Sequence, residues 1–239
     1  MRRLYRRLLA HALTMERSLL LAIGAASGAV WAFIEIAEEV SEGESRAWDR
    51  TLLLALRSAG DPASPWGPAW MHEMARDFTA LGGVGVLTLL TAAAFGYLRI
   101  IGKRHAALAV LVAVIGGQLL SLALKMGFDR ARPDLVPHGS IVYTASFPSG
   151  HSMMAAVTYL TLGAMLARVH APLRIKAYLL SLALILTLLV GVSRVYLGVH
   201  WPTDVAAGWA VGSAWALACH FAMQQLQRRG EVEPAADPP

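Results

Sequence analysis

The segment SRVYLGVHWPTD, from Ser193 to Asp204, decides how the rest of the chain is interpreted. It joins two long apolar runs and contains an arginine, a histidine and an aspartate, namely Arg194, His200 and Asp204. Ionisable side chains are costly at membrane depth and are retained where they face one another or a functional site. We therefore expect this segment to form part of a site at the ends of two helices.

The composition is that of a membrane protein. Of the 239 residues, 56% are hydrophobic and 15% are charged, whereas soluble domains carry about 25% charged residues. Six apolar runs are long enough to cross about 30 Å of hydrocarbon as helices: 18–36, 79–98, 105–126, 151–168, 176–193 and 203–223. The sequence predicts an all-α, polytopic membrane protein in which residues 1–223 form one bundle of six transmembrane helices. The first helix is predicted to be retained rather than cleaved as a signal peptide.

Basic residues are divided unequally between the two ends of the predicted bundle. The N-terminus, the 99–104 loop, the 168–176 loop and the tail hold 13 of the 21 Lys and Arg residues. Since positively charged loops stay in the cytoplasm, we expect both termini on the cytoplasmic side of a bacterial cell membrane. The loops that carry the functional motifs then lie on the outer face. The net charge of +5 follows from this distribution, so no nucleic-acid partner is expected.

Two segments fall outside the predicted helices. Residues 38–78 contain the amphipathic stretches AWDRTLLLALR and WMHEMARDF and form either a solvated connector or a pair of helices at the outer membrane interface. Residues 224–239 are polar and Pro-rich and are predicted to be a disordered cytoplasmic tail. The single cysteine, Cys219, excludes an intrachain disulfide and a cysteine-based metal cluster.

Two further stretches bring polar groups to the same face as the opening segment. KMGFDRARP ends the third helix with Lys125 and then supplies Arg132, whose planar guanidinium suits bidentate contact with phosphate oxygens. SFPSGHSM opens the fourth helix, where Ser149 is a good N-cap and Gly150 lets a ligand approach the backbone. The free N–H groups at that helix start favour an anion beside His151.

The opening segment itself supplies a reactive pair. Pro202 fits the first position of the last helix, so Asp204 lies in the first turn and its carboxylate can reach the ring of His200. A carboxylate fixes the tautomer of an imidazole and leaves the other nitrogen free to attack. The cations of the three stretches would stabilise a transferring phosphoryl group, with one histidine as nucleophile and the other as general acid. Metal catalysis is the rival use of two histidines and an aspartate, and the nearby Lys and Arg residues argue against it.

The three stretches resemble the pattern of the type 2 phosphatidic acid phosphatase family. Six residues separate Lys125 from Arg132-Pro133, and residues 148–151 read PSGH. Five residues separate Arg194 from His200, and three more lead to Asp204. The resemblance covers about residues 77–215 and implies a haloperoxidase-like core that needs no metal or other cofactor.

The same resemblance implies a role for each matching residue. His200 would be the nucleophile that forms a phosphohistidine, with Asp204 as its orienting partner and His151 as the acid for the leaving group. The phosphate would be bound by Lys125, Arg132, Ser149, Gly150 and Arg194. Arg130 lies outside the minimal pattern, and the resemblance implies no role for it.

These features predict an integral membrane phosphatase that hydrolyses a lipid phosphomonoester or pyrophosphate. Phosphatidic acid, phosphatidylglycerophosphate and undecaprenyl pyrophosphate are compatible substrates, and family analogy favours the last by a small margin. A lipid phosphotransferase, which passes the phosphoryl group to an acceptor other than water, would use the same residues. A non-enzymatic lipid-binding or transport protein is a further alternative, but it would have no reason to keep both histidines and Asp204.

Overall fold

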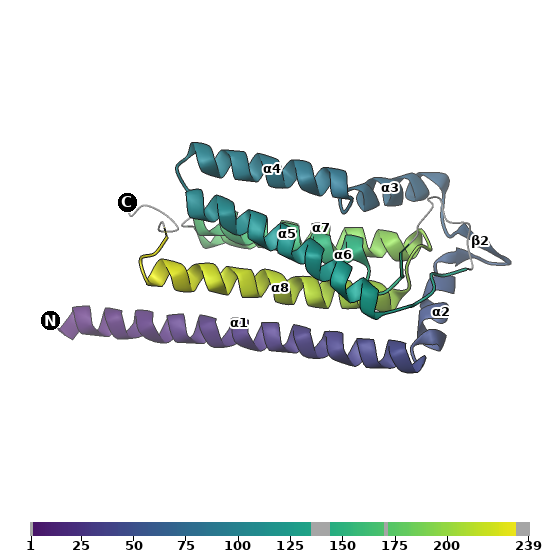
Figure 1. Ribbon diagram of the computed structural model, residues 1–239, viewed down its shortest axis with the longest axis horizontal. Helices are drawn as coiled ribbons and strands as arrows, with labels where there is room; N and C mark the ends of the chain where they lie inside the picture. Colours follow the sequence, from purple (N-terminus) through teal and green to yellow (C-terminus); the bar gives the residue numbers. More distant parts are fainter. Residues whose placement is uncertain (1, 135–143, 170–171, 233–239) are drawn as a thin grey trace.

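The protein is described by a computed structural model that covers residues 2–134, 144–169 and 172–232. Long helices lie side by side, and the start of the first helix lies at the same end of the bundle as the end of the last helix (Figure 1). In chain order the elements are α1 (Arg2–Glu42), α2 (Arg46–Leu54), β1 (Arg57–Ser58), β2 (Asp61–Pro65), α3 (Ala69–Ala80), α4 (Val84–Ile100), α5 (Arg104–Gly127), α6 (Gly150–Val169), α7 (Leu173–Tyr196) and α8 (Pro202–Arg228). The predicted all-α membrane architecture is confirmed in its main features.

Four helices are each long and apolar enough to cross a membrane: Leu20–Glu42 of α1, and the whole of α5, α7 and α8. The pair α3 and α4, bent by 48° at its break, is a fifth candidate. The chain is therefore an integral membrane protein with four or five candidate spans among its described residues. The count of six stays a prediction, because α6 is not among the candidate spans found in the described residues.

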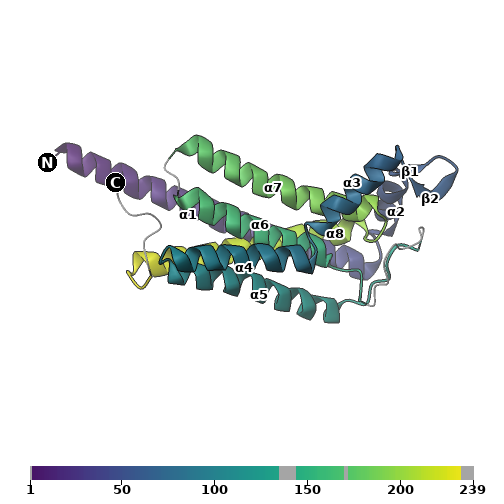
Figure 2. The ribbon, with the colours of Figure 1, turned by 90° about the horizontal axis from the view of Figure 1, so that it is seen from above.

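Helix α6 is enclosed by its neighbours. It contacts α4, α5, α7 and α8 and lies between α5 and α7 (Figure 2). Every side chain from Ser152 to Tyr159 is buried. A helix that other helices surround meets little lipid, so its surface need not be uniformly apolar.

Glycines let α6 and α8 approach closely. A Cβ added at Gly208 would lie 2.7 Å from the backbone oxygen of Ser149, and one at Gly212 would lie 2.5 Å from that of Met153. Residues four apart share one helix face, and this spacing of small residues is typical of tight contacts between membrane helices. The contact joins the starts of the two helices, since the N–H of Ser149 donates to the backbone oxygen of Asp204 at 2.9 Å.

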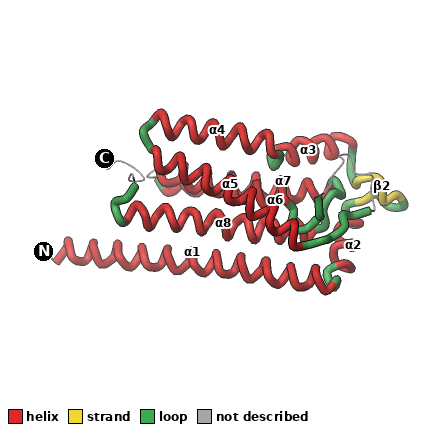
Figure 3. The backbone as a smooth tube through the Cα atoms, viewed as in Figure 1, coloured by secondary structure: helices red, strands yellow, loops and turns green. Residues whose placement is uncertain are grey.

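Residues 38–78 are an ordered part of one end of the bundle, where the hairpin and several loops gather (Figure 3). Helices α2 and α3 occupy the two amphipathic stretches, in keeping with the second of the two alternatives, whereas the hairpin of β1 and β2 was not predicted. Leu53 of α2 packs against Val195 and Val205. Arg57 donates to the backbone oxygen of Tyr196 at 2.7 Å. The segment is therefore fixed to α7 and α8 and is not a free connector.

The helices differ most from the predicted runs at three places: the run 79–98 is interrupted between Ala80 and Val84, and α1 and α8 are longer than predicted. Helix α1 begins at Arg2 instead of Ser18, and its 41 residues extend over about 60 Å at 1.5 Å per residue. Helix α8 runs to Arg228, so residues 224–228 are helical and do not belong to a disordered tail. The thickness of the membrane limits the apolar part of a helix but not its polar extension, and α8 stops only before Gly230, whose φ is +72°. Residues 233–239 lie outside the described residues.

Candidate active site

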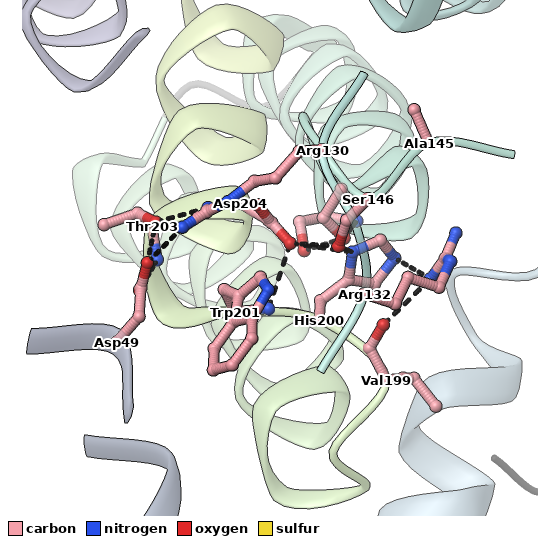
Figure 4. Close-up of polar contacts among 12 residues, drawn as sticks. Asp49, Arg130, Arg132, Ala145, Ser146, Val199, His200, Trp201, Thr203 and Asp204 are labelled. Atoms are coloured by element: carbon pink, nitrogen blue, oxygen red, sulfur yellow. Dashed lines mark hydrogen bonds and ion pairs between the residues drawn. The ribbon is translucent and has the colours of Figure 1, made fainter. Parts of the chain in front are cut away.

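His200 and Asp204 meet at the start of α8, as the sequence predicts. The helix begins at Pro202, and Oδ2 of Asp204 accepts the backbone N–H of Trp201 at 3.0 Å. The same oxygen lies 3.3 Å from Nδ1 of His200 and accepts a hydrogen bond from the hydroxyl of Ser146 (Figure 4). His200 is 2% exposed and Asp204 is 0% exposed, so water does not compete for these contacts.

This arrangement decides which nitrogen of His200 can react. Nδ1 faces the carboxylate and carries the proton, so Nε2 keeps its lone pair. Nε2 lies 3.0 Å from Nη1 of Arg132, which also donates to the backbone oxygen of Val199 at 2.8 Å. Burial lowers the pKa of His200 to about 3, although its hydrogen bond with Asp204 acts in the opposite direction. The ring is therefore neutral at pH 7 and can act as a nucleophile through Nε2.

Three predicted cations gather at this end of the bundle. Nζ of Lys125, in the last turn of α5, donates to the backbone oxygen of Ala145 at 2.8 Å. Nη1 of Arg194, in the last turn of α7, donates to the hydroxyl of Thr79 at 2.9 Å, and its buried Nε has no hydrogen-bond partner among the described residues. The charges of Lys125, Arg132 and Arg194 act on one another. Neighbouring cations repel, so the cluster favours a bound anion.

The start of α6 contributes its backbone. The hydroxyl of Ser149 accepts the N–H of Ser152 at 3.4 Å, which confirms Ser149 as the N-cap. The same hydroxyl accepts the Ser152 hydroxyl at 2.9 Å, and Ser149 is fully buried. A Cβ at Gly150 would lie 3.5 Å from Cε of Lys125. The glycine thus brings the helix N-terminus next to that cation.

His151 lies in the first turn of α6 and shares this electrostatic environment. It interacts electrostatically with Arg194, His200, Arg132 and Lys125. A Cβ at Gly82 would lie 3.2 Å from the backbone oxygen of His151, so the chain before α4 packs directly on it. The structure brings all eight predicted site residues to one end of the bundle.

Four residues of the site were not predicted from the sequence. A fifth, Arg130, had been noted but was assigned no role. The hydroxyls of Ser146 and Thr79 contact Asp204 and Arg194 respectively. Thr203 and Asp49 belong with Arg130 to a second network around Asp204. Ser146, Thr79 and Thr203 lie within residues 77–215, which resemble the family, and Asp49 lies before them, but a lone hydroxyl or carboxylate in a sequence does not reveal its partner.

The donor set suits a phosphate group. Side chains of Lys and Arg and the N–H groups of a helix start all bind anions. Among the described residues, no three His, Cys, Asp or Glu side chains are grouped so that they could hold a metal ion. We therefore regard this cluster as a candidate phosphate site with His200 at its centre.

Comparisons with known proteins agree with this geometry. A model of the PAP2 superfamily matches residues 106–228. Phosphatidylglycerophosphatase B of Bacillus subtilis (strain 168) is 36% identical over 151 residues, which are 60% of this chain and 70% of that protein. An undecaprenyl-diphosphatase of Sulfolobus acidocaldarius is 36% identical over 88 residues, which are 37% of this chain and 36% of that protein.

A solved structure is similar over most of the chain. It is the crystal structure of a transmembrane PAP2-type phosphatidylglycerolphosphate phosphatase from Bacillus subtilis, with a TM-score of 0.70 and 26% sequence identity. The similarity covers 87% of this chain and 98% of that one. From the sequence match and the shared fold, the chain belongs to the PAP2 superfamily.

Proposed function

We propose that the protein is a membrane lipid phosphatase that works through a phosphohistidine on His200. The observation that carries this proposal is the orientation of His200, with Nδ1 on the Asp204 carboxylate and Nε2 beside Arg132. The relatives are named for phosphatidylglycerophosphate and undecaprenyl diphosphate, which supports a lipid phosphate as substrate. The longer match is to the first of these, so we place phosphatidylglycerophosphate ahead of undecaprenyl pyrophosphate.

In the first step, Nε2 of His200 attacks phosphorus and the bond to the leaving oxygen breaks. Arg132, Arg194 and Lys125 bind the non-bridging oxygens and stabilise the charge on them. The Nε of Arg194, which has no hydrogen-bond partner within the described part of the chain, is one donor available for this contact. The N–H groups at the start of α6 add further donors.

Two proton-handling groups complete the cycle. Asp204 stabilises the positive charge that the ring of His200 acquires when its Nε2 bonds to phosphorus. His151 gives a proton to the leaving oxygen and then, as a base, takes one from the water that hydrolyses the phosphohistidine. The products are the dephosphorylated lipid and inorganic phosphate, and no metal takes part in these steps.

An apolar groove beside the site supports a lipid substrate. The groove, of about 180 Å³, lies between α3 and α7, and its lining includes Trp70, Met74, Phe78, Leu189, Val192 and Ser193. Two lining residues, Phe78 and Ser193, directly precede Thr79 and Arg194, which are hydrogen bonded in the site. A lipid whose phosphate is bound by Arg194 would place a hydrocarbon chain in this groove.

We place the active site at the outer surface of a bacterial cell membrane, in a bundle with six spans. The start of α1 and the end of α8 lie at one end of the bundle, and the motif loops lie at the other (Figure 1). The positive-inside rule assigns the terminal end to the cytoplasm. The other five spans are α1, the bent pair of α3 and α4, α5, α7 and α8. Helix α6, enclosed by its neighbours, is then the sixth span.

Phosphate release by the purified protein in detergent tests the proposal. The substrates would be phosphatidylglycerophosphate, undecaprenyl pyrophosphate and phosphatidic acid, each with and without EDTA. We expect release that resists EDTA and is absent from a His200→Ala variant. Release that EDTA abolishes would overturn the metal-free mechanism, and no release from any of these lipids would overturn the proposed substrate class.

A further inference from the structure

Arg130 joins two buried carboxylates (Figure 4). Its Nη1 donates to Oδ1 of Asp204 at 2.6 Å and to the hydroxyl of Thr203 at 2.8 Å. Its Nη2 donates to Oδ2 of Asp49 at 2.5 Å and to the hydroxyl of Ser45 at 3.2 Å. The side chains of Asp204 and Asp49 are 0% and 1% exposed, so this guanidinium supplies the positive charge that both need.

Asp49 fixes this network to α2. Its Oδ1 accepts the backbone N–H of Thr203 at 2.9 Å, and its Oδ2 accepts the Thr203 hydroxyl at 2.6 Å. Thr203 lies 154 residues later in the chain and directly precedes Asp204. One carboxylate of α2 therefore holds both Arg130 and the first turn of α8.

The two oxygens of Asp204 have different partners. Oδ1 accepts the hydrogen bond from Arg130. Oδ2 accepts from Ser146 and Trp201 and faces Nδ1 of His200. Both terminal nitrogens of Arg130 donate to protein groups, so this arginine acts on the carboxylate and not on the phosphate.

We propose that Arg130 and Asp49 are positioning residues for the reaction. They fix the plane of the Asp204 carboxylate, so that Oδ2 holds Nδ1 of His200 and Nε2 points to the phosphorus atom. This inference rests on the proposed role of His200 as nucleophile. If the carboxylate is free to rotate, the imidazole loses its attack geometry, and a shift of about 1 Å at a reacting group can cost about 100-fold in rate.

Two conservative substitutions test the assignment. Arg130→Lys keeps the charge but loses the planar fork that reaches two carboxylates at once. Asp49→Asn keeps an acceptor for Thr203 but removes the charge that holds Arg130. We expect each to lower kcat about tenfold and to leave KM within about twofold, because neither side chain binds the substrate. Arg50→Lys, an exposed position on the same helix, is the matched control and should keep the wild-type kcat.

A double-variant cycle separates positioning from a purely structural role. In an Asp204→Asn protein, the added Arg130→Lys change should alter kcat by less than about twofold. The carboxylate through which Arg130 positions His200 is already absent from that protein. The same tenfold loss in both backgrounds would overturn the inference. So would a wild-type kcat for Arg130→Lys in the otherwise unchanged protein.

Binding of orthovanadate supplies a readout that does not depend on lipid turnover. Vanadate can take a nucleophile as its fifth ligand and so resembles the transition state of phosphoryl transfer. We expect Arg130→Lys to weaken vanadate binding about tenfold, measured by titration calorimetry, and Arg50→Lys to leave it unchanged. If wild-type protein binds vanadate and hydrolyses no lipid phosphate, the proposed function fails while this inference is still tested. Equal vanadate affinities for wild type and Arg130→Lys would overturn the inference, and no binding by wild type would overturn both.

Discussion

Replacement of Asp204 by asparagine keeps the shape of the side chain and removes the charge that orients His200. The groups that face this carboxylate are all donors: Arg130 at Oδ1, and Ser146, the Trp201 N–H and Nδ1–H of His200 at Oδ2. An amide offers one acceptor oxygen and one NH₂ donor. In either orientation of the amide, its NH₂ therefore meets another donor, and the buried network cannot be satisfied.

The size of the effect follows from the charge that develops on the ring. When Nε2 bonds to phosphorus, the ring of His200 becomes positive, and the Asp204 carboxylate 3.3 Å away stabilises it. Loss of the corresponding charge in the serine-protease triad lowers kcat about 10⁴-fold. A contact of 3.3 Å is longer than the usual 2.7–2.9 Å of charge-assisted bonds, so we expect a smaller loss here. Our expectation is about 10³-fold in kcat, which is about 4 kcal/mol at 1.36 kcal/mol per factor of ten.

The assay is phosphate release from the preferred lipid, with thermal unfolding of the detergent-solubilised protein as a test of folding. Glu73→Gln is the matched control, because it neutralises an exposed carboxylate that pairs with Arg76 at 3.8 Å on the surface. This control should keep the wild-type kcat. A folded Asp204→Asn protein with kcat within tenfold of wild type would refute the reasoning.

Three more expectations concern binding, packing and pH. Arg132→Lys keeps its charge but loses the fork near His200, so kcat/KM in the same release assay should fall about tenfold; a wild-type value would contradict this. Gly212→Ala places a Cβ 2.5 Å from the backbone oxygen of Met153 and should lower thermal stability by about 1–3 kcal/mol. Gly85→Ala, where no described atom lies within 4 Å of the added Cβ, should leave the stability unchanged. Equal losses of stability in the two variants would count against the packing argument. Burial lowers the pKa of His200 from 6.5 to about 3, so the unfolded chain binds a proton first as pH falls, and stability should decline between about pH 6.5 and 3. A His200→Gln protein should lose part of that decline, and an unchanged pH dependence would contradict the shift.

Contacts between close neighbours in the chain were predictable. Pro202 fixes where α8 begins, and a residue in the first turn of a helix can reach a side chain just before it. The contact between Asp204 and His200 follows from that local geometry. The cap that Ser149 provides for α6 is local in the same way. The apolar runs were predictable because the membrane requires a minimum length of apolar helix.

Contacts between distant segments were not predictable. Asp49 is one of eight acidic residues between 38 and 78, and only the packing of α2 against α8 selects it as the partner of Arg130. Strand β1 has two residues, too few for an alternating pattern to appear. The composition predicts where α6 lies, but its enclosure by four helices is a property of the assembled bundle.

Detection of a phosphoenzyme tests the central claim most directly. Wild-type protein would be mixed with a lipid that carries a radiolabelled phosphate, and the reaction would be stopped within one turnover by alkali, in which phosphohistidine is stable. The account predicts acid-labile label on the peptide that contains His200, and no label on a folded His200→Ala protein. Label of the same kind on His200→Ala, or turnover by wild type without any labelled protein, would contradict it.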